Sequence, residues 1–366
     1  MVVKEITDLI EQVAPLSFQE NYDNAGLIVG EHSNKVQGIL LCLDITEAVL
    51  EEALQHNCNL IIAHHPIVFK GLKKFNGKNY VERVVIKAIQ NNLNLYAAHT
   101  NLDNVMSNGV NEKIASKLEL THIQILKPLS ENLAKLVTYC PPQYSEMLRK
   151  SLWEAGSGNI GKYDQCSFST IGTGTFRGNE DSHPSIGTKG ELEKVQEERI
   201  EILFEKQNQN HLIKSLKQNH PYEEVAYEIY DIANENQTKG AGVIGTLAEP
   251  LTQAEFLQFL KVKMNLTAIR YTETQTDYIS KIAICGGSGR FLLEDAMRQG
   301  ADVFVTADFK YHDYFEAEHK IMVCDIGHYE SEIFTTEIFM KIIQEKFPKF
   351  APRFTETNTN PIKYYI

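Results

Sequence analysis

Residues 60–66 read Leu-Ile-Ile-Ala-His-His-Pro, a short apolar run that ends abruptly in two histidines. A run of four apolar residues bounded by polar sequence is typical of a strand buried on both faces, as in a parallel sheet. Helical patterns flank it at residues 47–55 and 81–90, and another short apolar run follows at 95–98. This alternation predicts an α/β fold whose mainly parallel sheet is covered by helices.

The same alternation extends towards the N-terminus and returns near the end of the chain. Up to residue 127 it predicts further helices at 6–13 and 108–118 and further strands at 26–29 and 39–43. After residue 239 it predicts strands at 243–247, 279–284, 303–306 and 321–324, and helices at 253–264, 291–299 and 331–347. We expect residues 1–127 and 239–366 to form one unit made of two mainly parallel α/β layers.

Residues 128–238 have a different character and interrupt this pattern. Predicted strands lie at 133–139, 165–171, 199–204 and 225–230, and predicted helices at 145–155 and 211–218. The order β-α-β-β-α-β is that of a ferredoxin-like α+β domain. We therefore expect an inserted domain with a core of its own.

The composition narrows the function classes. The net charge is −12 and no block of Lys and Arg stands out, so nucleic acid is an unlikely partner. No apolar run reaches 18 residues and the N-terminus does not resemble a signal peptide, so we expect a cytoplasmic protein without a membrane partner. The 6 cysteines form no C-x-x-C pair, and those in or beside apolar runs are expected to be buried hydrophobic residues: Cys42, Cys58, Cys285 and Cys324.

Four predicted strands end in side chains with polar chemistry. Because ligands bind beyond the carboxyl ends of parallel strands, these groups are expected to converge on one site. Strand by strand, the groups are His64 and His65; His99 and Asp103; Asp308, Lys310, His312 and Asp313; and Asp325, His328 and Glu332.

The spacing of these groups favours two metal ions over one. Adjacent side chains on a strand point to opposite faces, so His64 and His65 would each serve a separate ion. His328 and Glu332 are four residues apart and share one face near the start of the last predicted helix, where a carboxylate can bridge two cations. Together with the His and Asp residues at the other strand ends, these four residues predict a metal site. Nitrogen and oxygen ligands suit zinc, iron(II) or manganese.

Other residues near the predicted site allow two readings each. His99 and His312 are candidates for proton transfer or for orienting a ligand, and are otherwise structural histidines. Asp44 either orients a metal ligand or caps the helix at 47–55. The glycine-rich stretch 286–290 either presents N–H groups to a phosphate or forms a tight strand-to-helix turn.

Several motifs together resemble the Nif-three-like dinuclear-metal family, whose bacterial members are often labelled GTP cyclohydrolase I type 2 homologues. The motifs are Asn21-Tyr-Asp-Asn-Ala-Gly-Leu-Ile-Val-Gly30, Ala63-His-His-Pro66, His99-Thr-Asn-Leu-Asp103, Gly286-Gly-Ser-Gly289, Gly327-His-Tyr-Glu-Ser-Glu332 and Thr359-Asn-Pro361. The resemblance implies that His64 and Asp103 hold one ion, that His65 and His328 hold the other, and that Glu332 bridges them. It also implies a toroidal homohexamer and an inserted signalling-protein-like domain.

These expectations favour a metal-dependent hydrolase. Two divalent ions would activate a water that attacks a nucleotide-type substrate, for a GTP-like substrate at C8 of the purine, with Lys310 or Arg290 near the phosphates. The alternative is a metal-stabilised hexameric binding, scaffold or regulatory protein without catalysis.

Overall fold

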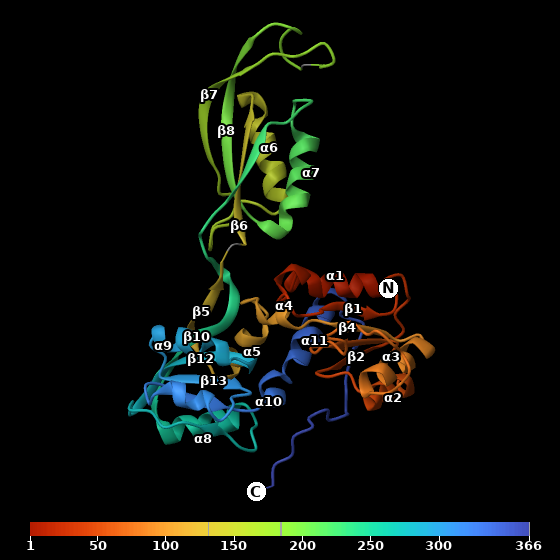
Figure 1. Cartoon of the computed structure of the whole chain (residues 1–366), viewed down its shortest axis with the longest axis vertical. Coiled ribbons are helices and arrows are strands. Elements are labelled where there is room, and N and C mark those ends of the chain that lie inside the picture. Colours follow the sequence, from red (N-terminus) through yellow and green to blue (C-terminus); the bar gives the residue numbers. More distant parts are fainter. Residues whose placement is uncertain (131, 184, 366) are drawn as a thin grey trace. The chain divides into compact units, whose positions relative to one another are not determined.

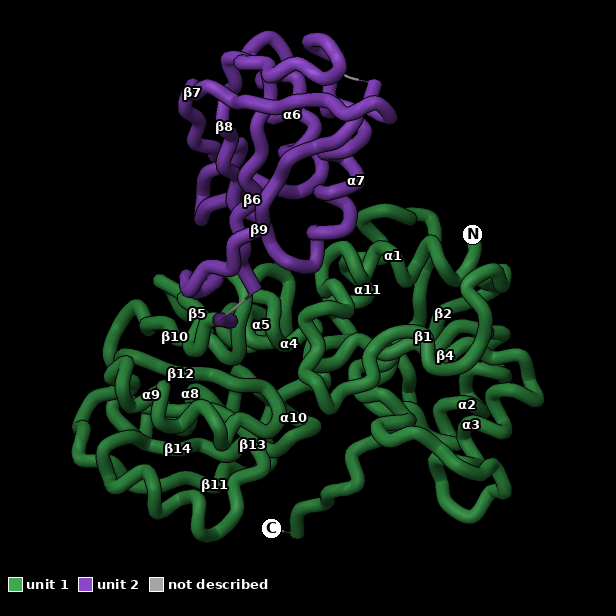
Figure 2. Tube along the Cα trace, turned by 45° about the horizontal axis from the view of Figure 1, so that its top comes forward, with its two compact units in different colours: residues 1–128, 238–366 green, residues 129–237 purple. Residues whose placement is uncertain are grey.

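The computed structural model describes residues 1–130, 132–183 and 185–365. Within these ranges the chain has a mixed α/β fold and divides into two compact units (Figures 1 and 2). Unit 1 comprises residues 1–128 and 238–366, and unit 2 comprises residues 129–237. No helix in the described ranges is long and apolar enough to cross a membrane.

The first half of unit 1 builds a sheet around the stretch 60–63. Its elements are α1 (Val3–Val13), η1 (Leu16–Phe18), β1 (Gly26–Val29), β2 (Ile39–Cys42), α2 (Glu47–Gln55), β3 (Leu60–Ala63), α3 (Tyr80–Gln90), β4 (Asn94–Ala97), α4 (Thr100–Asp103), α5 (Val110–Lys117) and, from the end of the chain, β15 (Arg353–Phe354). Among the described residues the strand order is β1-β4-β3-β2-β15, and only β1 runs antiparallel to its neighbour.

This first sheet is buried on both faces, which explains the wholly apolar runs. Leu40, Ile61 and Leu95 pack with Val49 and Val84 of α2 and α3 on one face. On the other side, α1 and α11 (Thr335–Lys346) contact each other, and α11 contacts β2. Helices on both faces are what a parallel sheet requires.

The second half of unit 1 forms another sheet. Its elements are β5 (Thr121–Leu129), β10 (Asn236–Thr252), α8 (Gln253–Lys263), β11 (Arg270–Tyr271), β12 (Tyr278–Ser288), η3 (Arg290–Leu292), α9 (Leu293–Arg298), β13 (Val303–Ala307), η4 (Asp313–Ala317), β14 (Met322–Asp325) and α10 (His328–Glu332). In the described ranges the order is β11-β14-β13-β12-β10-β5, with β12, β13 and β14 parallel. Phe304 and Val323 pack on Leu293 and Ala296 of α9, while α5 and α10 contact β12.

Some predicted elements differ from the structure. The helix expected at 331–347 is two helices, α10 and α11, so His328 and Glu332 lie on the short α10. Strands β11 and β15 are two residues long, too short to carry any period in the sequence. Strand β5 was also missed, because its polar and apolar residues do not alternate cleanly along its exposed edge.

Unit 2 has its own sheet and core. Its elements are β6 (Leu133–Cys140), α6 (Pro142–Glu154), β7 (Phe168–Phe176), β8 (Glu193–Glu205), η2 (Lys206–Asn208), α7 (Gln209–Asn219) and β9 (Tyr227–Asp231). The described strands pair antiparallel in the order β7-β8-β6-β9. Leu136 and Ile202 of this sheet pack on Leu148 of α6 and Leu212 of α7.

Candidate metal centre

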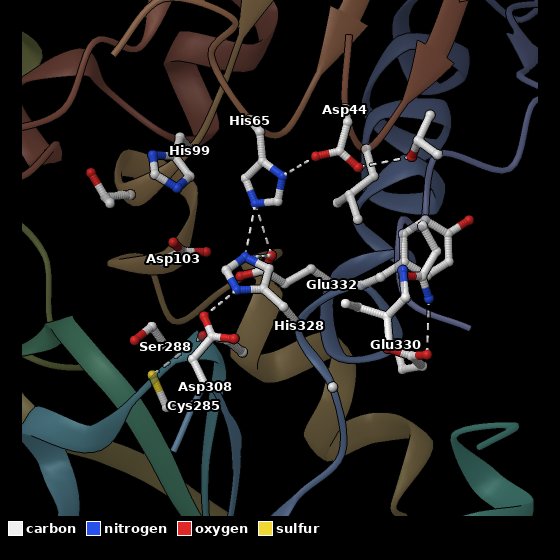
Figure 3. A pocket seen from close by; sticks show the side chains of 18 of the residues that line it. Asp44, His65, His99, Asp103, Cys285, Ser288, Asp308, His328, Glu330 and Glu332 are labelled. Carbon is white, nitrogen blue, oxygen red and sulfur yellow. Dashed lines mark hydrogen bonds and ion pairs between the residues drawn. The ribbon is translucent and has the colours of Figure 1, made fainter. Parts of the chain in front are cut away.

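The carboxyl ends of strands from both sheets of unit 1 open onto a single cavity of about 1160 Å³. Asp44 follows β2, His65 follows β3 and His99 follows β4 in the first sheet. Asp308 follows β13 and His328 follows β14 in the second sheet. Polar groups from these strand ends therefore meet in one cavity, although the strands belong to two different sheets (Figure 3).

His64 is fully buried and presents a bare nitrogen to two carboxylates. Its Nδ1 lies 2.8 Å from the carbonyl oxygen of Ala98, which can only accept, so Nδ1 carries the proton and Nε2 the lone pair. Nε2 lies 3.6 Å from Oδ1 of Asp103 and 3.7 Å from Oε1 of Glu332. Within the described chain neither Nε2 of His64 nor Oδ1 of Asp103 has a hydrogen-bond partner. Burial lowers the pKa of His64 to about 4, which keeps the ring neutral.

His65 and His328 are both oriented by carboxylates from outside the ligand set. Nδ1 of His65 lies 2.7 Å from Oδ1 of Asp44, and Nδ1 of His328 lies 2.7 Å from Oδ2 of Asp308. Their Nε2 atoms therefore turn towards Oε2 of Glu332, at 3.0 Å and 2.9 Å. Such carboxylate–imidazole pairs fix the ring and make the free nitrogen a better ligand.

The same carboxylates control the protonation of these two rings. Burial lowers the pKa of His65, but hydrogen bonds to Asp44 and Glu332 outweigh burial and raise it to about 9. Burial likewise opposes charge on His328, while bonds to Asp308 and Glu332 raise its pKa to about 11. A metal ion bound here would displace the protons from these nitrogens, because a ligating imidazole must be deprotonated.

Glu332 is the centre of the arrangement. Its side chain is almost fully buried; one oxygen faces His64, and the other faces His65 and His328. Burial raises its pKa, but the surrounding histidines outweigh burial and hold the pKa well below its usual value. The backbone of Gly287, at φ +62, approaches so closely that a Cβ there would lie 2.2 Å from Oε1 of Glu332. Only glycine leaves room for the carboxylate at this point.

The donor atoms are near enough to share cations. In the described ranges, three groups have donor atoms within 4.8 Å of one another: His64, Asp103 and Glu332; His65, His328 and Glu332; and His64, His65 and His99. Glu332 belongs to the first two groups. The unpaired lone pairs on His64 and Asp103 and the nitrogen–oxygen donor set fit a divalent metal ion. The five predicted ligands are thus brought together.

The two candidate proton-transfer residues end up in different places. His99 lines the cavity; its Nδ1 lies 2.8 Å from Oδ1 of Asp23, and one of its ring nitrogens lies within 4.8 Å of ring nitrogens of His64 and His65. His312 precedes η4 and stacks edge-on with Tyr311; it is not among the described residues that line the cavity. The expectation that His312 takes part in the chemistry is not supported by its position.

The phosphate-binding readings are also corrected. The N–H groups of Gly286, Gly287 and Gly289 donate to side chains of Asn111, Ser331 and Thr306, so these three amides at the end of β12 are already paired within the protein. Arg290 pairs with Glu316 and Asp313, and neither Arg290 nor Lys310 is found among the described cavity residues.

Sequence patterns alone do not settle the role of Asp44 or place the end of the chain at the site. The cap of α2 is Thr46, whose Oγ1 accepts from the N–H of Val49, so Asp44 is free to orient His65. Residues 355–365, which we name the tail, supply one wall of the cavity. Oγ1 of Thr359 donates to Oδ2 of Asp44 at 2.8 Å. The Thr359-Asn-Pro361 motif was visible in the sequence, but nothing local connects it to a strand end three hundred residues earlier.

The tail is tied down on both sides of Thr359. Glu52 of α2 accepts hydrogen bonds from the hydroxyls of Thr355 and Thr357. Nδ2 of Asn360 donates to Oε1 of Glu330 at 3.0 Å. The wall is therefore a fixed part of the fold.

Comparison with known proteins agrees with these features. A family model described as Duf34/NIF3 (NGG1p interacting factor 3) matches residues 1–361. The chain is 36% identical over 370 residues to a Bacillus subtilis (strain 168) protein named GTP cyclohydrolase 1 type 2 homolog, covering 99% of this chain and 98% of that protein. A Halalkalibacterium halodurans protein of the same name is 37% identical over 346 residues, 93% of each chain.

Solved structures of similar proteins also match nearly the whole chain. A Bacillus cereus protein related to NIF3 matches with a TM-score of 0.86 and 34% identity, covering 100% of this chain and 99% of that one. A Staphylococcus aureus protein matches with a TM-score of 0.78 and 31% identity, covering 100% and 99%. The chain belongs to the Duf34/NIF3 family.

Proposed function

We propose that this protein is a hydrolase that depends on two divalent metal ions. His64 and Asp103 would hold one ion, His65 and His328 the other, and Glu332 would bridge them. The observation that carries the proposal is the pair of buried, unpartnered atoms, Nε2 of His64 and Oδ1 of Asp103, because buried polar atoms without partners are rare in native proteins. The donor set suits zinc, iron(II) or manganese.

The protein side of the chemistry follows from the contacts. Bound at these residues, divalent ions would lower the pKa of a coordinated water and polarise a substrate oxygen. Asp44 and Asp308 hold the rings of His65 and His328 in one tautomer. His99, fixed through Asp23, is placed to take up or deliver a proton at its free ring nitrogen. Three protein ligands per ion, counting Glu332 twice, leave positions open, as in catalytic and not structural sites.

For the substrate we propose a nucleotide-type molecule, because the curated relatives carry the name GTP cyclohydrolase 1 type 2 homolog. The cavity of about 1160 Å³ is large enough for such a ligand.

The test combines metal analysis with a substrate screen. Wild-type protein should bind two equivalents of metal per chain and hydrolyse at least one member of a nucleotide and phosphoester panel. Glu332→Gln should fall well below two equivalents and lose turnover, since the amide cannot offset two cations. His312→Ala, outside the cavity, is the matched control and should behave like wild type. Two tightly bound ions without turnover on any substrate would favour the scaffold alternative.

We further propose, on the family resemblance, that the chain assembles as a toroidal homohexamer and that unit 2 is a ferredoxin-like domain. Light scattering coupled to gel filtration should give six times the monomer mass, as expected of a closed symmetric assembly. A stable monomer or dimer at micromolar concentration would contradict the hexamer.

A further inference from the structure

The cavity around the metal-binding residues is strongly acidic. In the described part of the chain its lining contains a single Lys or Arg side chain, that of Arg270. The carboxylates in the same lining are Glu20, Asp44, Asp103, Asp308, Asp325, Glu330 and Glu332. Even two divalent ions would bring only four positive charges, which the carboxylates of Asp44, Asp103, Asp308 and Glu332 would offset. A ligand with several negative charges would meet uncompensated repulsion there.

Arg270 is held in place at the edge of this cavity. It lies on β11 opposite Asp325 of β14, and its Nη2 donates to Oδ2 of that residue. Asp325 is buried and also accepts hydrogen bonds from the N–H of Phe309 and the hydroxyl of Tyr314. The carboxylate is therefore fixed, and it fixes one edge of the guanidinium. The Arg270 side chain is still 66% exposed, so its remaining N–H groups can reach a ligand.

The lysines next to the cavity do not change this balance. Lys70, Lys73, Lys74 and Lys78 lie in the segment between Phe69 and Tyr80, both of which line the cavity. None of the four is among the described lining residues. Among the described lining residues, a polyphosphate held in the cavity would therefore find one guanidinium and no Lys or second Arg side chain.

Several aromatic side chains in the lining offer flat apolar surface. Tyr22, Phe69, Tyr80, Phe291 and Tyr364 all line the cavity, and their side chains are between half-buried and exposed. Exposed aromatic faces of this kind stack on planar rings and on heterocycles. The cavity of about 1160 Å³ that Arg270 shares with the metal-binding residues is large enough to hold such a body.

We propose that this cavity selects a substrate with an aromatic or heterocyclic body and a single oxyanion group, a phosphate monoester or a carboxylate, which Arg270 binds. Arg270 is the specificity-determining residue, and di- and triphosphates are disfavoured. The proposal rests on the proposed hydrolase only in placing the reaction in the same cavity. A guanidinium with one edge already committed still presents parallel N–H donors to one oxyanion.

The test is direct binding by calorimetry to full-length, zinc-loaded protein in excess Mg²⁺, with metal content measured after each titration. The probes are guanosine, GMP, GTP, phenyl phosphate and phenylacetate; the last two distinguish a phosphate from a carboxylate ligand. GMP should bind at least about 10-fold more tightly than guanosine or GTP, as a charge-assisted hydrogen bond allows. Arg270→Gln should reduce GMP binding to the level of guanosine.

Two further variants control for charge and folding. Arg290→Gln removes the same charge from an arginine outside the cavity and should leave GMP binding unchanged. If Arg270→Gln leaves Asp325 buried without its partner and unfolds the protein, the double variant Arg270→Gln/Asp325→Asn removes that cost and should still lose GMP binding.

The outcomes separate this proposal from the hydrolase. Tighter binding of GTP than GMP, GMP binding that ignores Arg270, or no binding of any probe with one oxyanion group would each overturn the proposed substrate class. Binding that depends on Arg270 without hydrolysis of any nucleotide would support the substrate class and refute the hydrolase. Hydrolysis of a nucleotide with a kcat/KM unaffected by Arg270→Gln would support the hydrolase and refute the proposed role of Arg270.

Discussion

Replacing Gly287 by alanine should disable metal binding by pushing on Glu332. The new Cβ would lie 2.2 Å from Oε1 of Glu332, whereas an ordinary carbon–oxygen contact is about 3.4 Å, so the carboxylate would have to move by about 1.2 Å. Metal–ligand distances tolerate only about 0.2 Å. We therefore expect one metal bond to be lost and affinity to fall at least about 10-fold, equivalent to about 1.4 kcal/mol.

Gly287→Ala should also lower folding stability, independently of metal binding. Gly287 has a φ of +62, and an alanine in that conformation costs about 1 to 2 kcal/mol of folding stability. Gly300 provides a matched control, because its φ is +70 and a Cβ there meets nothing within 4 Å. Gly300→Ala should pay the same backbone cost without touching the site.

The assay compares both variants with wild type in two ways. Thermal unfolding of metal-free protein measures the backbone cost. The melting temperature should fall by a similar amount in Gly287→Ala and Gly300→Ala. Competition against a colorimetric zinc chelator measures affinity, and only Gly287→Ala should lose it. Equal zinc affinity in the two variants would refute the reasoning, since it would mean that the position of the Glu332 carboxylate does not control binding.

Three further changes test other parts of the site. Thr359→Val removes the hydroxyl that donates to Asp44 and should weaken zinc binding severalfold in chelator competition by freeing the ring of His65; Thr359→Ser should restore it, and failure of that rescue would argue against the hydrogen bond. Stripping metal with a chelator should lower the melting temperature of wild type, because metal at a free concentration of 100 Kd adds about 2.7 kcal/mol to the free energy of unfolding. The melting temperature of Glu332→Gln should fall less. An unchanged wild-type melting temperature would speak against specific binding. Replacing residues 129–237 by a short Gly/Ser linker should leave a folded protein with the same metal content, because unit 2 has its own core; a folded product without metal would contradict this.

Parts of the fold could be predicted because their signals are local. Strand β3 occupies Leu60–Ala63 and helix α2 Glu47–Gln55, both as expected, because an apolar run and an amphipathic period depend only on neighbouring residues. The helix expected at 108–118 begins instead at Val110, because Asn108 adopts a positive φ and Gly109 takes the cap position. Element ends depend on such turn conformations, which sequence patterns specify poorly.

The candidate site likewise combines features that local sequence predicts with features that depend on the packing of the whole unit. Strand ends predicted that His65 and His328 approach each other, but the strands belong to two sheets, and which strand ends meet is decided by packing over the whole unit. His99 and His312 have the same local signal, a histidine shortly after a buried strand. They differ in position because His99 lies two residues after β4 and is fixed by Asp23, whereas His312 lies five residues after β13, beyond Asp308 with its φ of +61.

The tail has a consequence for how the protein is made. Residues 355–365 leave the ribosome after every other part of the cavity wall, so a nascent chain can fold both sheets while the pocket still lacks one side. Ion capture with correctly oriented imidazoles should therefore be a late event that follows synthesis of Thr359.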